Sequence, residues 1–76
     1  MKLENNLKVL RAKRNITQEE LAEAIGVSRQ TINAIELGKF NPSVLTALNL
    51  AKFFETTVEE IFFISKEWNH EKNGQL

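Results

Sequence analysis

The sequence predicts an all-α fold, and repeated helix start and stop signals are the observations behind this prediction. Thr17 can cap a helix start, and Glu20 stands three residues on, where its side chain can return the hydrogen bond. Gly26 follows the last apolar residue of this segment, where a helix end favours a left-handed residue. Ser28 then provides a second cap. Two short helices joined by a tight corner are therefore expected between Thr17 and Glu36.

A first helix is expected before this pair, from Glu4 to about Arg14. Either Asn5 or Asn6 could cap it, and the spacing leaves both choices open. The expected apolar stripe consists of Leu3, Leu7 and Leu10, with Lys8 and Lys13 facing outward.

The two central helices have the pattern of a helix-turn-helix. Apolar residues flank both caps as hydrophobic staples, Ile16 with Leu21 and Val27 with Ile32. At about 100° per residue, Ile32 lies on the same side of the second helix as Ile35. Roughly opposite lie Gln30, Asn33, Ala34 and Leu37, with Arg29 at the exposed start.

That opposite side has the residue types that read DNA bases. Arg can donate two hydrogen bonds to guanine, Gln or Asn can bracket adenine, and a small Ala can approach the thymine methyl group. The pattern therefore favours a helix lying in the major groove. The alternative is the solvated face of an ordinary amphipathic helix.

The loop after the second central helix runs from Leu37 to Ser43. Gly38 can take a positive φ, and Pro42 moves Asn41 out of the helical conformation. Ser43 is then a plausible cap, so a fourth helix is expected from Ser43 to about Phe54.

A short fifth helix is expected after the capping box of Thr57 and Glu60. Beyond it, Phe62, Ile64 and Trp68 alternate along the chain, which favours a short C-terminal strand. Residues 1–64 should form the domain and residues 65–76 a tail with a frayed end. The expected core residues of the last two helices are Val44, Leu45, Leu48, Ala51, Phe54, Val58, Ile61 and Phe62.

Composition sets the limits of what this chain can be. Its 76 residues suit one domain, and 42% apolar residues suffice for a core. The lack of Cys excludes disulfides and thiolate metal sites and fits a reducing cytoplasm. The longest apolar run, Ile61–Ile64, is too short to span a bilayer, and the N-terminus lacks an apolar signal core. A cytoplasmic chain without membrane contact is expected.

Catalysis is not expected from this sequence. No nucleophile, base and orienting group stand together, and no Gly-rich phosphate loop is present. His70 is the single His and has no Cys or Asp near it, so a free surface imidazole is expected rather than a metal ligand. We therefore expect no enzyme, no cofactor, no metal and no small-molecule ligand.

The charge is balanced overall but unevenly distributed. Ten Lys and Arg match ten Glu, whereas DNA-binding domains are usually basic. Residues 1–14 carry a net charge of +4 from five basic residues and one Glu, and residues 43–76 carry −2 from three Lys and five Glu. Such polarity would orient the chain on a phosphate surface.

From about Leu7 to Phe62 the chain resembles the Cro and phage-repressor type of helix-turn-helix regulator, also called the xenobiotic-response-element family. The resemblance is carried by Ile16–Ala22, Val27–Ile32, Leu10–Arg11, Ile35–Lys39, Asn41–Ser43 and Thr57–Phe62, which agree in order and spacing. It implies a short single-domain member with five helices, the third in the major groove of double-stranded DNA, and binding as a two-fold dimer.

The resemblance also implies roles for single residues. Arg11 should pair with Glu36, although both could be ordinary surface charges. Gln18 should contact a phosphate at its helix start and also support residue 29, while Lys39 and the amides near Asn41 contact the backbone. The expected DNA-binding set is Gln18, Ser28, Arg29, Gln30, Asn33, Lys39 and Asn41.

The sequence thus predicts a sequence-specific regulator of transcription, namely a repressor that acts as a homodimer on a two-fold operator. The rival is a protein-interaction module with the same fold, such as an antitoxin or anti-repressor, and the neutral total charge favours it mildly. Apolar residues beyond the fifth helix, Phe63, Ile64 and Trp68, are the expected dimerisation residues. In the alternative, Phe63 and Trp68 fold back over their own domain.

Overall fold

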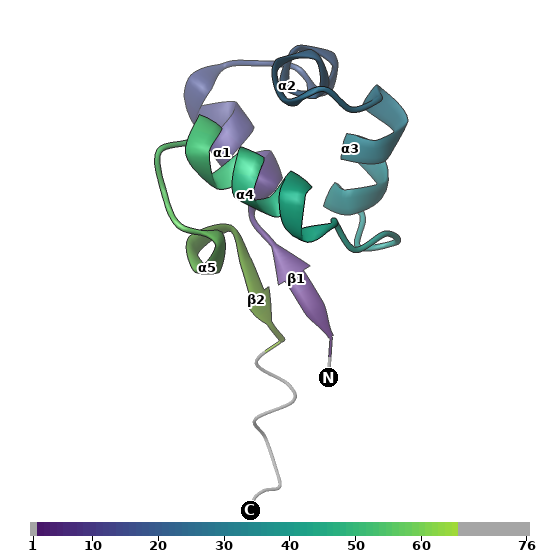
Figure 1. The fold of residues 1–76 in the computed structure, drawn as a ribbon, viewed down its shortest axis with the longest axis vertical. Helices are drawn as coiled ribbons and strands as arrows, with labels where there is room; N and C mark the ends of the chain where they lie inside the picture. The colour runs from purple at the N-terminus through teal and green to yellow at the C-terminus, as the bar shows by residue number, and fades with distance from the viewer. Residues whose placement is uncertain (1, 66–76) are drawn as a thin grey trace, which may run out of the picture.

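The computed structural model describes residues 2–65 and contains five helices and one two-stranded sheet in that part of the chain (Figure 1). The order is β1 (Leu3–Asn5), α1 (Leu7–Arg14), α2 (Gln18–Ile25), α3 (Arg29–Glu36), α4 (Val44–Phe53), α5 (Val58–Ile61) and β2 (Phe62–Ile64). The all-α class with a short C-terminal strand is confirmed. Trp68 and His70 lie outside the described residues.

The predicted caps are present where the sequence signals placed them. Thr17 and Glu20 exchange both bonds of a capping box at the start of α2. Ser28 and Ser43 cap α3 and α4 by accepting the N–H groups of Thr31 and Thr46. At α5 the structure forms one half of the predicted box: the Thr57 hydroxyl accepts the N–H of Glu60. These ends are therefore determined locally.

The N-terminal segment differs from the prediction of a helix beginning at Glu4. Leu3–Asn5 form β1, which pairs antiparallel with β2, with Leu3 opposite Ile64 and Asn5 opposite Phe62. In Figure 1 the two strands extend together away from the helices. The helical spacing of Leu3 and Leu7 was misleading, because a strand of three residues gains its hydrogen bonds from a partner near the other end of the chain.

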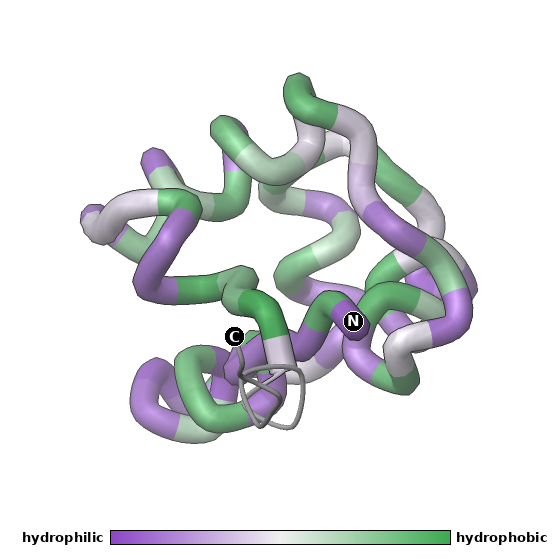
Figure 2. The backbone as a smooth tube through the Cα atoms, turned by 90° about the horizontal axis from the view of Figure 1, so that it is seen from below, coloured by the Kyte–Doolittle hydropathy of each residue, from purple (hydrophilic) through white to green (hydrophobic). Residues whose placement is uncertain are grey.

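The core lies where the helices meet. Hydrophobic and hydrophilic stretches alternate along the backbone (Figure 2), as expected for helices that pack with one apolar side. Leu7, Leu21, Ile32, Leu50 and Ile61 are fully buried and come from five different helices. The domain therefore has one shared core. None of the helices within residues 2–65 is long and apolar enough to cross a bilayer.

The prediction for α4 was partly wrong. Val44, Leu45 and Leu48 were expected in the core but are 76%, 69% and 54% exposed. The inner side is formed instead by Ala47, Leu50, Ala51 and Phe54. Because α4 is apolar on both sides, spacing alone could not identify which side packs.

Candidate nucleic-acid interface

The exposed side of α3 is the candidate DNA-reading surface. Ile32 and Ile35 are 0% and 1% exposed, so this helix is fixed to the core along its inner side. Arg29 and Gln30 are exposed at its N-terminal end, and Asn33 and Ala34 are partly buried. The structure thus keeps the predicted division of the helix into an anchored side and a polar side.

The corner between α2 and α3 holds the start of α3 in place. Gly26 has a φ of 80°, in the left-handed region that favours glycine, and its N–H bonds to the carbonyl of Ala22 at 2.9 Å. Val27 also donates to Ala22, at 3.0 Å. Ser28, which is exposed, then caps α3 directly beside Arg29. The exposed N-terminal end of α3 therefore follows a turn that two backbone hydrogen bonds hold.

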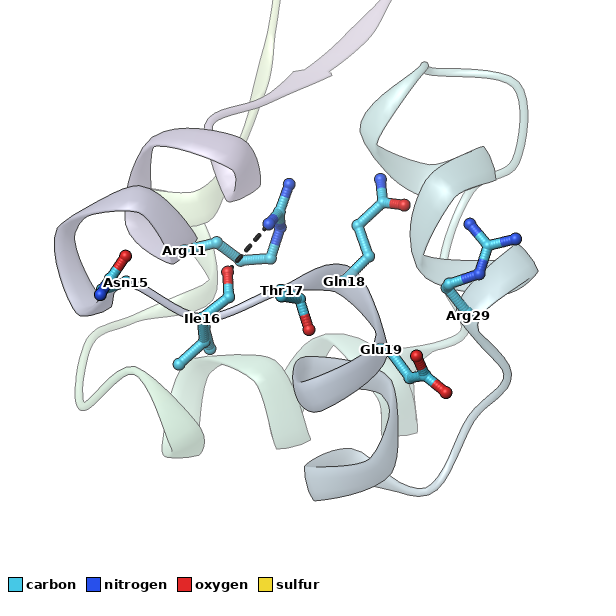
Figure 3. Close-up of a pocket in the computed structure, with 7 residues that line it drawn as sticks. All are labelled: Arg11, Asn15, Ile16, Thr17, Gln18, Glu19 and Arg29. Atoms are coloured by element: carbon cyan, nitrogen blue, oxygen red, sulfur yellow. Dashed lines mark hydrogen bonds between the residues drawn. The ribbon is translucent and has the colours of Figure 1, made fainter.

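Arg11 and Glu36 form the ion pair expected from the resemblance. The guanidinium Nε lies 2.6 Å from Oε2 of Glu36, Nη2 donates to Oε1 at 3.1 Å, and the two side chains are 14% and 7% exposed. The hydrogen bond to Glu36 raises the pKa of Arg11 against the opposing effect of burial. Arg11 also donates from Nη1 to the carbonyl of Ile16 at 3.0 Å (Figure 3). The pair therefore joins α1, the start of α2 and the end of α3.

Gln18 is engaged differently from the prediction. Its Nε2 donates to Oε1 of Glu36 and to Oδ1 of Asn33, both at 3.0 Å. Within residues 2–65 no hydrogen bond joins this side chain to Arg29, and Oε1 of Gln18 is the atom that could accept one from the guanidinium. Its backbone N–H, at the first position of α2, is the group still suited to a phosphate.

Gln18 and Arg29 nevertheless line one open groove between α1, α2 and α3 (Figure 3). Its lining consists of Arg11, Asn15, Ile16, Thr17, Gln18, Glu19 and Arg29. In the close-up the Gln18 side chain extends between the Arg11 guanidinium and the α3 ribbon. The N-termini of α2 and α3 therefore face the same side of the molecule.

The predicted phosphate-binding loop follows α3. Gly38 has a φ of 77°, and its N–H and that of Lys39 bond to the carbonyls of Ile35 and Ala34. Lys39 and Asn41 are both exposed. The loop is thus fixed at its start by backbone hydrogen bonds, while its polar side chains face solvent.

Asn5 makes a contact in this region that its sequence pattern did not indicate. Its Nδ2 donates to the carbonyl of Ile35 at 2.9 Å, and its Oδ1 accepts the N–H of Leu7 at 3.1 Å. Its role as a possible cap gave no sign of the first contact, because Ile35 is thirty positions further along the chain. Asn5 therefore supports α3 from the strand side.

The dimerisation residues that the structure describes lie on β2. Phe63 is 40% exposed and Ile64 46%, although their strand pairs with β1 of the same chain. Phe63 is therefore partly covered by its own domain and partly exposed. Residues 2–65 contain no cluster of three or more potential metal ligands of the His, Cys, Asp or Glu type.

Comparison with known proteins supports the assignment of this chain to the helix-turn-helix type. The model of the helix-turn-helix family matches residues 7–61. An HTH-type transcriptional regulator of Methanocaldococcus jannaschii is 55% identical over 60 residues, which are 79% of this chain and 91% of that protein. The transcriptional activator BcrR of Enterococcus faecalis is 39% identical over 61 residues, which are 80% of this chain and 30% of BcrR. The phage repressor RstR of Vibrio cholerae is 37% identical over 75% of this chain and 51% of RstR.

Proposed function

Since the chain belongs to the helix-turn-helix family of DNA-binding transcriptional regulators, we propose that it is a sequence-specific repressor that acts in the cytoplasm as a homodimer on a two-fold operator. The observation that carries this proposal is the construction of α3. Arg29 and Gln30 are exposed at its start, while Ile32 and Ile35 hold its other side in the core. A helix fixed in this way presents the same side chains to every duplex.

Base reading is assigned to the exposed side of α3 and phosphate contact to its surroundings. Arg29 can donate two hydrogen bonds to guanine, and Gln30 can bracket adenine. Ser28, Lys39, Asn41 and the backbone N–H of Gln18 would then hold the domain on the phosphates. Repression needs only occupancy of an operator to block transcription, and RstR, which is similar to this chain over 57 residues, is a repressor.

Two exposed apolar surfaces support a homodimer. One consists of Phe63 and Ile64 on β2, and the other of Val44, Leu45 and Leu48 on α4. Val44, Leu45 and Leu48 carry no charge, so two copies related by a two-fold axis could bring these residues together without repulsion between them. We assign the main contact to β2 and treat the α4 surface as its competitor.

Selection of duplexes from a random pool tests the proposal. The unaltered chain should enrich one sequence with two-fold symmetry, and a variant with Arg29→Ala and Gln30→Ala should lose that enrichment. Lys52→Ala, an exposed change on α4, is the control and should select the same sequence. Failure of the unaltered chain to enrich any sequence would favour the protein-interaction module, such as an antitoxin or anti-repressor, whose surface the neutral total charge also suits.

A further inference from the structure

Four side chains link α1, α2 and α3 through consecutive hydrogen bonds. Arg11 donates to Glu36 at 2.6 and 3.1 Å, and Nε2 of Gln18 donates to Oε1 of Glu36 and Oδ1 of Asn33 at 3.0 Å each. This Arg11–Asn33 chain ends on the polar side of the reading helix.

The chemistry of its members determines the direction of every bond in the chain. A guanidinium only donates and an ionised carboxylate only accepts, so Arg11 and Glu36 leave no choice. The Gln18 atom facing the carboxylate must therefore be the amide nitrogen. That nitrogen has two hydrogens, and the second reaches Asn33, which can accept it only through Oδ1.

We infer that the Arg11–Asn33 chain selects the base that Asn33 reads. The inference rests on the proposed function, in which α3 lies in the major groove. The bond from Gln18 occupies one of the two lone pairs of Oδ1 and fixes its direction, while Nδ2, on the opposite branch of the planar amide, donates to no acceptor among residues 2–65. In this proposal Asn33 therefore offers the groove the donor Nδ2, and its amide is not free to turn its donor and acceptor together toward adenine.

A single donor matches acceptor atoms in the major groove, namely O6 and N7 of guanine or O4 of thymine. Gln18 is therefore a positioning residue for base choice, although its own side chain donates to protein atoms. In Figure 3 the Gln18 side chain lies between Arg11 and α3, where its hydrogen bonds can fix the orientation of the Asn33 amide.

Two substitutions at Gln18 separate this role from simple packing. Gln18→Met keeps the length of the side chain but cannot donate, so Asn33 becomes free to turn and bracket adenine. Gln18→Lys keeps a donor facing Glu36 and Asn33, so the original preference should remain. Neither change alters Arg11 or Glu36, and thermal melts of both variants provide the control for folding.

Random-pool selection is run with the unaltered chain, Asn33→Ala, Gln18→Met and Gln18→Lys. The base pair whose preference disappears in Asn33→Ala is the one that Asn33 contacts. At this base pair we expect guanine or thymine for the unaltered chain and for Gln18→Lys. For Gln18→Met we expect a shift toward adenine on the order of fivefold or more.

The inference is overturned if Gln18→Met keeps the original preference, if the unaltered chain already selects adenine there, or if Asn33→Ala changes no base pair. Those results leave the proposed function intact, because the unaltered chain still enriches a sequence. If the unaltered chain enriches nothing, the proposed function and this inference fail together.

Discussion

The side-chain amide of Asn5 donates to the main-chain carbonyl of Ile35 at 2.9 Å and so joins the first strand to the reading helix. Its Oδ1 also accepts the N–H of Leu7, which starts α1. Asn6, the next residue, occupies the cap position without a side-chain cap bond, and its Oδ1 is buried without a hydrogen-bond partner. We therefore expect the side chain of Asn5 to stabilise the fold and that of Asn6 to destabilise it.

We expect Asn5→Ala to lower the free energy of unfolding by about 1–3 kcal/mol, because it removes a helix-start bond and leaves the Ile35 carbonyl with one bond fewer. Asn6→Ala is the matched control. It removes a buried unpaired oxygen, so the expected change is about zero or slightly stabilising. Urea melts measure both, and equal losses in the two variants would contradict this division of roles.

Glu36→Ala should cost on the order of 3 kcal/mol, because it leaves the Arg11 guanidinium in a site that is 14% exposed without its carboxylate. Glu23→Ala, an exposed change on α2, should stay within about 0.5 kcal/mol. Denaturant midpoints compare them. A midpoint that barely moves in Glu36→Ala would mean that the pair contributes no more than surface charges do.

Arg29→Ala should cost about 1–3 kcal/mol of binding free energy at a single base pair of the operator and relax the choice of base there. Lys39→Ala should weaken binding to all duplexes alike and reduce the salt slope by about one unit. Competition titrations with single-base operator variants, repeated at several salt concentrations, separate the two effects. An unchanged base preference in Arg29→Ala would remove this residue from the reading surface.

Phe63→Glu should convert the homodimer to a monomer, because it places a charge on an apolar, 40% exposed surface while the backbone pairing of β2 is kept. Sedimentation velocity measures the state of assembly, and binding to a palindromic site should lose its cooperativity. Leu45→Glu serves as the comparison. A dimer that survives Phe63→Glu and is lost in Leu45→Glu would move the interface to α4.

Local signals predicted a large part of this fold, because a cap and its backbone partner lie within three residues. Thr17, Ser28 and Ser43 are examples, and each caps the helix that it was expected to start. Which side of α4 packs was not predictable in this way. Leu48 is apolar but exposed, and Leu50 is apolar and buried, so the neighbouring helices decide between them.

The candidate site shows the same division. The anchored side of α3 follows from the spacing of Ile32 and Ile35. The partner of Gln18 could not be predicted from spacing, because it depends on the angle at which α2 meets α3. That angle places Asn33 and Glu36 within hydrogen-bonding distance of the Gln18 amide, and no pattern in the sequence predicts the angle.

The pairing of β1 with β2 also bears on the order of events during synthesis. Leu3 and Ile64 lie at opposite ends of the domain, so the sheet cannot form until β2 has been translated. The helices, whose contacts are closer in sequence, can pack earlier. The bond from the N–H of Ser65 to the carbonyl of Lys2, at 2.7 Å, would then close a domain whose helices are already in place. A chain that ends just before β2 should therefore keep its helices while the residues of β1 stay unpaired.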